Sequence, residues 1–488
     1  MTHAPALPER PAANDVNLPG SRVTSDRMVT IVLAISGLTA AFMQTVVTPI
    51  IPELPALLHA STSDATWVLT ATLLAAAVAA PITGRLGDMF GKRRIALVLL
   101  FLMLLGSIVC ATSDSIVPMI AGRALQGLGI GVVPLGISIL RDAVRPQSLG
   151  RSVALVSATL GVGGAIGLPA AAWIAQNLDY HYLFVFSAAL TLAAIILVWI
   201  FIPASIFRSG GRFDFLGAIG FGIGIVGVLL ALSKSSTWGW TSPAVLALLL
   251  GGAVVLVVWG IVELRTHAPL VDLRLAARRP VLLTNLGSAT IGFAFFTMTS
   301  AGPVILESPS GSGVGLGQSL IAASLYLMPL GLVMFFIAPV AARLTAARGA
   351  RTSLVLGGTI VVAGFGAAAA FHSAVWQIVA ITAIVGLGIG FAYAAMPTLI
   401  MQSVPSSDTA ASNGLNSVAR TFGSSVASTI VGMTLAANST SSGGMLVPDS
   451  HAFTNAFLIA AAVSAGGVIL FGFIPRPAAA SRAGLQRA

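Results

Sequence analysis

The sequence predicts an all-α polytopic membrane protein, built as two pseudo-symmetric six-helix halves with two further helices inserted between them. Of the 488 residues, 56% are hydrophobic and only 8% are charged, whereas a soluble protein carries about 25% charged residues. The apolar residues form runs of about 20, the length of helix that crosses a bilayer. Blocks of residues near position 85 also recur near position 343.

Fourteen apolar runs, each bounded by charged or turn residues, are expected to span the membrane. An even number of spans places both chain termini on the same side. We expect the spans to begin near residues 28, 65, 95, 116, 151, 182, 214, 243, 281, 318, 353, 375, 409 and 453.

The cations test this count, because Lys and Arg in short loops stay on the cytoplasmic side. With fourteen spans and cytoplasmic termini, 22 of the 25 lysines and arginines fall in cytoplasmic segments. Of the other three, Lys234 falls in an outer loop, while Arg123 and Arg420 fall inside spans. A missed span would place every later cluster of cations on the opposite side of the membrane. The charges therefore support both the number and the direction of the spans.

The internal repeat divides the chain into domains. A block that begins at Pro81 recurs from Pro339 at an offset of 258, and Gly-Leu-Gly-Ile-Gly at 127–131 returns at 386–390. Separate blocks that keep their register indicate a duplicated unit. We expect a first half at 28–203, an inserted pair of spans with a cytoplasmic linker at 204–279, and a second half at 280–475.

The remaining segments and the composition exclude several classes of protein. Residues 1–27 are expected to form a disordered cytoplasmic tail, and 476–488 a second cytoplasmic tail. The net charge of +10 comes from small clusters between apolar runs, which argues against a nucleic-acid partner. Cys110 is the single cysteine, so no disulfide framework is expected. The first span is too long for a cleaved signal peptide.

A basic stretch from Gly84 to Arg94 joins the second and third spans, and we expect a short loop there. Gly84 and Gly87 would allow helices to approach closely, and Gly91 would take a positive φ. A stop-transfer loop that only sets topology would also explain the charge. The order Gly-x-x-x-Asp-x-x-Gly-[Lys/Arg]-[Lys/Arg], however, resembles the loop between spans 2 and 3 of the major facilitator superfamily. That resemblance implies two halves that rock around a site at the bilayer midplane.

The same resemblance assigns a gating role to this stretch. Asp88 is expected to brace the cytoplasmic gate against a helix N-terminus near Ser406 and Ser407. Asp142 is expected close to Lys92 and Arg93. The second copy of the stretch has Ala346 in place of Asp88, so the two gates differ chemically. The predicted gating residues are Gly84, Asp88, Gly91, Lys92, Arg93 and Asp142.

Two arginines are expected inside the membrane, where an arginine costs about 2.5–3.5 kcal/mol on insertion scales. Arg123 and the residues after it resemble the span-4 motif of the superfamily, whose arginine is implicated in proton coupling. An arginine that snorkels outward and only pins the helix is the alternative. Arg420 lies beyond Asn413 and Asn416 on one polar stripe of span 13. That stripe could line the pathway or join the two halves.

Spans 5 and 1 match the antiporter pattern only in part. Span 5 is rich in glycine from Gly161 to Gly167, but Pro169 stands one place later than in the family's motif. Span 1 resembles the fourteen-span drug:proton antiporter family, yet Met43 occupies the place where many members have aspartate, and methionine carries no proton. The coupling candidates are Arg123, Glu53, Glu307 and Arg420, and Asp88 is a further acid that could carry the proton.

By analogy with the family, spans 1, 4, 9 and 12 would line the substrate cavity. Aromatic, methionine and weakly polar side chains suit bulky amphipathic compounds. The cavity candidates are Gln44, Thr45, Thr48, Gln126, Asn285, Phe295, Phe296, Met298, Tyr393, Met396, Asn413 and Asn416.

The sequence therefore predicts a secondary-active exporter of hydrophobic or amphipathic compounds, driven by proton antiport and working by alternating access. Two alternatives stay open: an exporter of an endogenous lipid or secreted metabolite, and a non-transporting membrane receptor or assembly partner. A Gly-x-Gly-x-x-Gly pattern at 222–227 lies in an unbroken apolar span with no strand before it, so helix packing explains it. No Walker A, metal or hydrolase motif is present, so we expect no enzyme, cofactor or metal site. The expected partners are membrane lipids, protons and a small hydrophobic substrate, for a monomer in the bacterial inner membrane.

Overall fold

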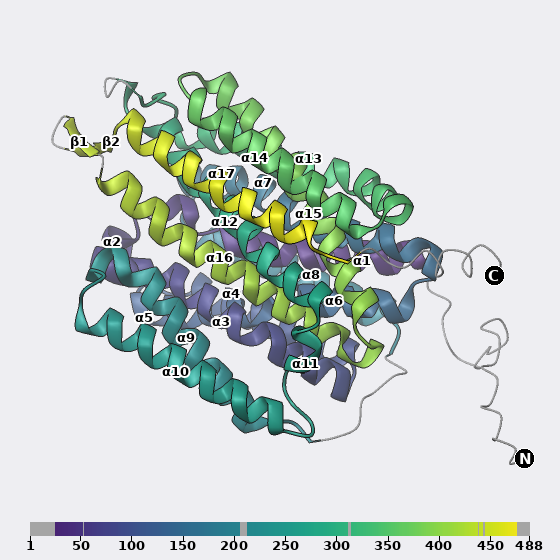
Figure 1. The fold of residues 1–488 in the computed structure, drawn as a ribbon. Coiled ribbons are helices and arrows are strands. Elements are labelled where there is room, and N and C mark those ends of the chain that lie inside the picture. The colour runs from purple at the N-terminus through teal and green to yellow at the C-terminus, as the bar shows by residue number, and fades with distance from the viewer. Residues whose placement is uncertain are drawn as a thin grey trace, which may run out of the picture.

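The computed structural model is a bundle of long helices that run between two opposite faces (Figure 1). It describes residues 25–51, 53–204, 212–310, 314–437, 439–442 and 445–475. The end where α1 begins and α17 ends is named the terminal face, and the opposite end, which carries a short β-hairpin, the hairpin face. Of the expected tail at 1–27, residues 1–24 lie outside the described residues, as does the expected tail at 476–488. Asp26 and Arg27, which were expected in the tail, are the first residues of α1.

The first six spans come from the helices that precede residue 202. The fourth span is formed by α5 and α6 together, because the helix is interrupted at Ile130 and Gly131. The elements are α1 (Asp26–Thr45), η1 (Thr48–Ile50), α2 (Leu54–Leu57), α3 (Thr62–Phe90), α4 (Lys92–Ala111), α5 (Ile116–Gly129), α6 (Val132–Ala143), α7 (Pro146–Asn177) and α8 (His181–Phe201).

The inserted pair and the second half follow. The inserted helices are α9 (Phe215–Trp238) and α10 (Pro243–Arg265), and α11 (Leu273–Ala276) leads into the second half. The second half contains α12 (Arg279–Glu307), α13 (Leu320–Arg348), α14 (Ala350–Ala370), α15 (Val375–Ser403), η3 (Ser406–Asp408), α16 (Thr409–Ala437), the antiparallel strands β1 (Ser439–Ser442) and β2 (Met445–Pro448), and α17 (Ser450–Gly472).

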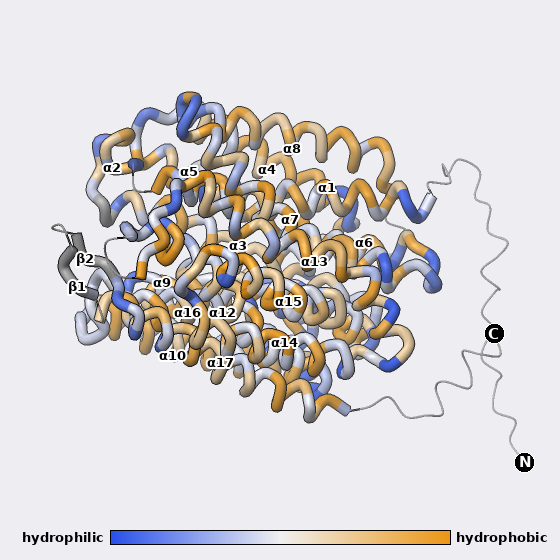
Figure 2. Tube along the Cα trace, turned by 90° about the horizontal axis from the view of Figure 1, so that it is seen from above, coloured by the Kyte–Doolittle hydropathy of each residue, from blue (hydrophilic) through white to orange (hydrophobic). Residues whose placement is uncertain are grey.

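The fourteen expected spans coincide with long helical segments whose first residues lie within five positions of the expected starts. Thirteen of them, among the described residues, are apolar enough to cross a membrane. The exception is α16, which is 29 residues long but polar. Its buried polar groups face neighbouring helices rather than lipid, which is where intramembrane polar residues are tolerated. Figure 2 shows the resulting pattern, with orange along the helices and blue near both faces. The predicted fold class is confirmed.

The two halves pack in the same way. In the first half α1 packs on α7 and α4 packs on α8, and in the second α12 packs on α16 and α14 packs on α17. The contacts between the halves are symmetric as well. In each half the second span packs on the fifth span of the other half, because α3 packs on α16 and α13 packs on α7. The equivalent turns share a backbone geometry: φ is 101° at Gly91 and 86° at Gly349. These correspondences follow the 258-residue repeat in the sequence.

The inserted pair covers one contact line between the halves. α9 packs against both α3 and α16, and α10 packs on α9 (Figure 1). Lys234 was expected in an outer loop, and this expectation is wrong. It lies inside α9 with 1% of its surface exposed, donates a hydrogen bond to Oγ1 of Thr66 and lies 4.6 Å from the ring centroid of Trp67. α9 continues to Trp238, so the ammonium group is held against α3 by a cation–π contact.

The expected loop from Gly84 to Arg94 is also corrected. α3 continues to Phe90 and α4 begins at Lys92, so Gly91 alone makes the turn. The charged residues reach the aqueous boundary from helix ends, and no loop is required to expose them. The positive φ expected at Gly91 is present, and it provides the reversal that an L side chain would resist.

Candidate functional site

The two halves touch at the terminal face through the backbones of α3 and α16. A Cβ added at Gly84 would lie 2.6 Å from the carbonyl carbon of Ala410, and one added at Gly414 would overlap the carbonyl oxygen of Ala80. Real Cβ atoms do not come so close, so glycine is required at both positions. The site therefore has a closed terminal end in this structure.

Lys92 links α3 to α6 at this closed end. Its Nζ lies 2.6 Å from Oδ2 of Asp142 and 3.6 Å from Oδ1 of Asp88. Asp88 and Lys92 are each 3% exposed, and neither carboxylate oxygen of Asp88 has a hydrogen-bond partner in the described part of the chain. Removing one partner from a buried ion pair leaves an uncompensated charge. This triad is the polar cluster at the closed terminal face, where the sequence analysis expects the gate.

Other expected contacts of the gate take a different form. The hydroxyl of Ser407 donates to Oδ2 of Asp408 at 2.7 Å and does not reach Asp88. Asp142 lies close to Lys92 as expected. Arg93 donates to the carbonyl oxygen of Trp199 on α8, and within the described chain Asp142 has its ion pair with Lys92. Among the described residues, the ion-pair partner of Asp88 is Lys92, on its own side of the interface, whereas Ser406 and Ser407 are exposed.

Arg141 ties the halves together, and the sequence analysis did not single it out. Its Nη1 donates to the carbonyl oxygens of Val404 and Pro405, each at 3.3 Å, and to Oγ1 of Thr409. Helix-terminal carbonyls have no partner inside their helix, and a cation there is favoured by the helix dipole. Arg141 of the first half thus caps the end of α15 in the second. Its position beside Asp142 was the signal available in the sequence.

Arg123 is almost fully buried, with 1% of its surface exposed. Its Nη1 donates to the carbonyl oxygen of Met43 at 2.7 Å and to Oε1 of Gln126 at 2.6 Å, and its Nε donates to the carbonyl oxygen of Val68 at 3.3 Å. Met43 lies in the last turn of α1, where carbonyls lack helical partners. The side chain points into the packing of α1, α3 and α5, which rules out the snorkelling alternative.

The Arg123 cluster continues through neutral groups. Nε2 of Gln126 donates to Oγ of Ser107 at 2.9 Å, and that oxygen lies 3.8 Å from Sδ of Met43. No acidic side chain of the described residues forms an ion pair with Arg123. The coupling candidates Glu53 and Glu307 are exposed near the hairpin face. Neither is among the hydrogen-bonded partners of this cluster.

A second polar cluster surrounds Arg420 on α16. Its Nη1 donates to Oδ1 of Asn416 at 2.9 Å, its Nη2 donates to Oγ of Ser417 at 3.3 Å, and its Cζ lies 5.1 Å from the ring centroid of Tyr393. Asn416 in turn donates to Oδ1 of Asn285 on α12 at 2.9 Å. The polar stripe of span 13 therefore joins α16 to α12 within the second half.

A small cavity lies between the halves beside Arg420. Its volume is about 10 Å³, room for about one water molecule. One wall comes from α6 and α7 of the first half and the other from α15 and α16 of the second. It is lined by Val133, Pro134, Ile137, Ser157, Leu160, Tyr393, Pro397, Asn413 and Arg420.

Spans 4, 5, 12 and 13 line this cavity, so spans 1 and 9, which the family analogy placed there, do not line it in this conformation. Of the expected cavity residues, Tyr393 and Asn413 are in the wall. Phe295 stands behind Tyr393, with ring centroids 6.4 Å apart. The others lie elsewhere: Gln44, Thr45 and Thr48 near the hairpin end of α1, Gln126 in the Arg123 cluster, Asn285 and Asn416 in the α12–α16 network, Phe296 partly buried against the second core, and Met298 and Met396 buried within it.

The glycines of span 5 serve close packing on two sides. A Cβ added at Gly163 would overlap Ala41 of α1, and one added at Gly331 of α13 would overlap the carbonyl oxygen of Gly161. α7 runs without a break through Pro169. The small residues let α7 contact the first half and the second half at once.

Comparisons with known proteins agree with this architecture. Residues 33–428 match a family model described as Major Facilitator Superfamily. Multidrug resistance protein B homolog of Mycobacterium tuberculosis is 26% identical over 380 residues, which are 76% of this chain and 68% of that protein. Multidrug resistance protein 3 of Bacillus subtilis is 26% identical over 388 residues, 75% and 71% of the two chains. The human organic anion transporter MFSD10 (TETRAN) has a TM-score of 0.62 at 16% identity and covers 91% of this chain and 99% of its own, a likeness of fold alone.

Proposed function

This chain belongs to the major facilitator superfamily, and from that premise we propose that it exports hydrophobic or amphipathic compounds by alternating access. One observation carries the proposal: a cavity with an aromatic and polar wall lies between two similar halves whose terminal ends are in contact. The names of the relatives support drugs as the cargo. The fourteen-span drug:proton antiporter family, which the sequence resembles, is consistent with both.

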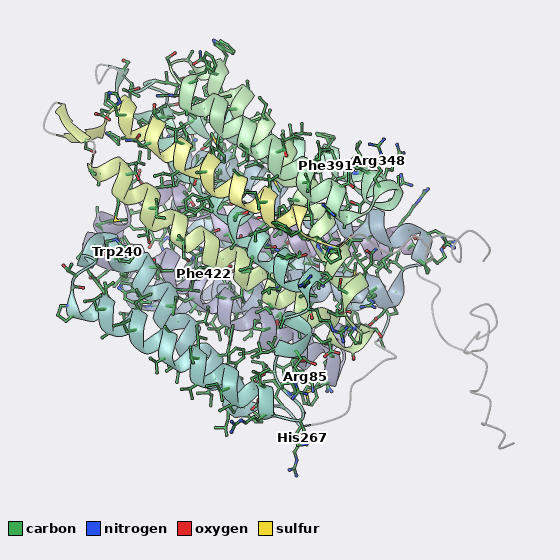
Figure 3. All side chains as sticks on the ribbon, viewed as in Figure 1. Arg85, Trp240, His267, Arg348, Phe391 and Phe422 are labelled. Carbon is green, nitrogen blue, oxygen red and sulfur yellow. The ribbon has the colours of Figure 1, made fainter. Side chains whose placement is uncertain are left out.

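The proposed cycle opens the terminal face, which is the cytoplasmic face if the cation distribution sets the topology. Figure 3 has Arg85, His267 and Arg348 at this end and Trp240 at the other. Opening would separate Gly84 from Ala410 and withdraw Arg141 from the end of α15. Cargo would enter the widened cavity from the cytoplasm and leave at the hairpin face. The proposed location is a bacterial inner membrane, with the protein acting as a monomer.

Proton antiport is the proposed energy source. Asp88 is the buried acid at the proposed gate, and among the described residues it has an ion pair with Lys92 but no hydrogen bond. When the gate opens, water would reach this carboxylate, and the acid could exchange a proton with the cytoplasm. Arg123 would contribute to coupling through its hydrogen bond to the carbonyl oxygen of Met43. This bond would keep the end of α1 attached to the first half as that half moves.

The test is transport by the purified protein in proteoliposomes with an imposed pH gradient. A panel of fluorescent dyes with anionic, neutral and cationic members serves as cargo, and wild type is compared with Arg123→Ala and Glu53→Gln. Gradient-dependent efflux that Glu53→Gln retains and Arg123→Ala abolishes would support export by antiport. An efflux rate that is the same with and without the pH gradient would contradict proton antiport, but it would still be consistent with export. No efflux of any dye by the folded protein would remove both.

A second candidate function, export of an endogenous lipid, is favoured by one observation. A groove of about 470 Å³ opens between α3 and α9 near Ile82 and Phe215, and every residue in it is apolar. An acyl chain could rest there. It shares no lining residue with the central cavity, so this candidate ranks second. Comparison of lipids secreted by a deletion strain and its complemented parent would test it, and identical lipid profiles would end it.

A further inference from the structure

Arg420 is a cation in the membrane interior whose described partners are all neutral. They are the side chains of Asn416, Ser417 and Tyr393, and none of the ion pairs in the described chain includes it. Charged side chains inside a membrane are expensive and usually have a partner of opposite charge. The missing partner is the feature that calls for an explanation.

The guanidinium also keeps donors for a ligand. It has five N–H groups in a fixed fork, and the structure gives one hydrogen bond to Nη1 and one to Nη2. The fork matches the oxygens of a carboxylate, sulfonate or phosphate. The backbone of α16 at Arg420 packs tightly against α12, because a Cβ added at Gly292 of α12 would overlap the carbonyl oxygen of Arg420.

The cavity wall opposite Arg420 has a different character. Val133, Pro134 and Ile137 of α6 and Leu160 of α7 form it, and none of the nine residues that line the cavity is acidic. A ligand between these walls meets a cation with hydrogen-bonding side chains on one side and an apolar surface on the other. This pattern selects a molecule with a negative head and a hydrophobic body, and it disfavours a hydrophobic cation.

We propose that the cargo is an amphipathic anion and that Arg420 binds its negatively charged group. This inference rests on the proposed export function and narrows its substrate class. Asn413 and Tyr393 line the same wall and complete the polar side of the site. The cavity admits about one water molecule in the closed structure, so the anion enters after the halves separate at the terminal face.

The test uses three probes with one aromatic body: a naphthalene sulfonate, the matching neutral sulfonamide and a naphthyl trimethylammonium salt. Binding of each to the purified full chain is measured for wild type, Arg420→Gln, Arg420→Lys and Arg151→Gln. Arg151 is an exposed cation on α7 and serves as the matched control. Thermal stability of every variant is recorded, so that a loss of binding is not confused with unfolding. Transport of the two permanently charged probes is measured in proteoliposomes.

We expect wild type to bind and export the sulfonate in preference to the ammonium salt. Arg420→Gln should weaken sulfonate binding at least about tenfold, the effect of losing a charge-assisted contact, and change sulfonamide binding less than about twofold. Arg420→Lys should keep the preference for the anion, while Arg151→Gln should match wild type. Sulfonate binding that survives Arg420→Gln, or export of the cation or of neutral dyes without the sulfonate, would overturn this inference and leave export intact. A folded protein that exports no probe and no dye would overturn both.

Discussion

The Nη1 atom of Arg123 lies 2.7 Å from the carbonyl oxygen of Met43, in the last turn of α1. The contact uses the backbone of residue 43 and not its side chain. Many members of the resembled family have an aspartate at the position of Met43. In the present chain, a helix-terminal carbonyl and the amide oxygen of Gln126 accept hydrogen bonds from Arg123 instead. Among the described residues, the charge of Arg123 is thus held without an acidic partner, and the first prediction tests what an acid at position 43 would add.

Met43→Asp should add a pH-dependent step to transport. The new carboxylate would stand beside Arg123 and Ser107 in a site that is fully buried, where a cation within about 4–6 Å favours the ionised acid. Transport rate is measured against pH for Met43→Asp, with Met43→Asn as the control of similar size. A pH profile for Met43→Asp that matches that of Met43→Asn would show that the position cannot couple to protons in this chain.

Gly84→Val should block closure of the terminal face. The side chain would enter the backbone of α16 at Ala410, so the closed state would be lost and transport should fall by at least about tenfold, the effect of about 1.4 kcal/mol. Gly251→Val on α10 is the matched control, because a Cβ there meets nothing within 4 Å and both are valines in a helix. Equal transport by the two variants, at equal membrane abundance, would contradict the contact.

Lys92→Gln should destabilise the closed gate more than any single acid variant, because it leaves both Asp88 and Asp142 without their cation. Breaking a buried ion pair costs about 3–5 kcal/mol, which should appear as a lower thermal midpoint. Arg348→Gln at the same face is the control, since its side chain is exposed. Equal midpoints for the two variants would place Lys92 outside the gate.

Asp88→Asn tests the gating role separately from stability. It keeps the size of the side chain and removes its charge, so Lys92 retains Asp142 alone. We expect slower transport at normal membrane abundance, with Asp114→Asn, whose side chain is 89% exposed, as the control. Unchanged transport by Asp88→Asn would mean that the gate works without this acid.

An anionic cargo should make transport respond to the membrane potential. An anion that leaves a negative interior gains about 2.3 kcal/mol per charge for each 100 mV, so a potassium diffusion potential should accelerate efflux of the naphthalene sulfonate. The comparison is made at equal pH on both sides of the vesicle membrane. A rate that does not change with potential would indicate that a compensating charge moves with the anion.

Much of the fold could be predicted from the sequence, because it depends on patterns that the bilayer imposes. Apolar runs of bilayer length predicted thirteen of the spans. The expected start of the polar α16 near residue 409 also agrees with the structure. The repeat predicted that Gly91 and Gly349 would occupy equivalent turns, and both have a positive φ.

The remaining errors concern structural features that cannot be predicted from the residues of one segment, because they depend on packing against distant segments. The stretch after Gly84 was expected to be a loop, because charge and glycine favour one, yet continuous helix exposes the same charges at a membrane face. Lys234 was assigned to an outer loop from the expected layout of the spans, although Trp67 and Thr66 of a distant helix hold it inside.

The partners of Arg123 and Arg141 are mainly backbone carbonyls. Every residue has a backbone carbonyl, so the residue types in the sequence do not show which one will accept the hydrogen bond. The cavity is lined by α6, α7, α15 and α16, so it forms where helices of both halves meet. This meeting depends on tertiary packing, which no single apolar run encodes, and α1 and α12, which the family analogy named, do not line it.

The central claim is that the two halves separate at the terminal face during transport, and the distance between α3 and η3 tests it most directly. Spin labels at Phe90→Cys and Ser406→Cys, in a Cys110→Ser background, report this distance by electron–electron resonance. A pair within the first half, Phe90→Cys and Gln147→Cys, is the control. The account predicts a short distance in the resting protein and a second, longer population when cargo is added, with no change in the control pair. A single short distance under conditions in which the labelled protein transports cargo would contradict it.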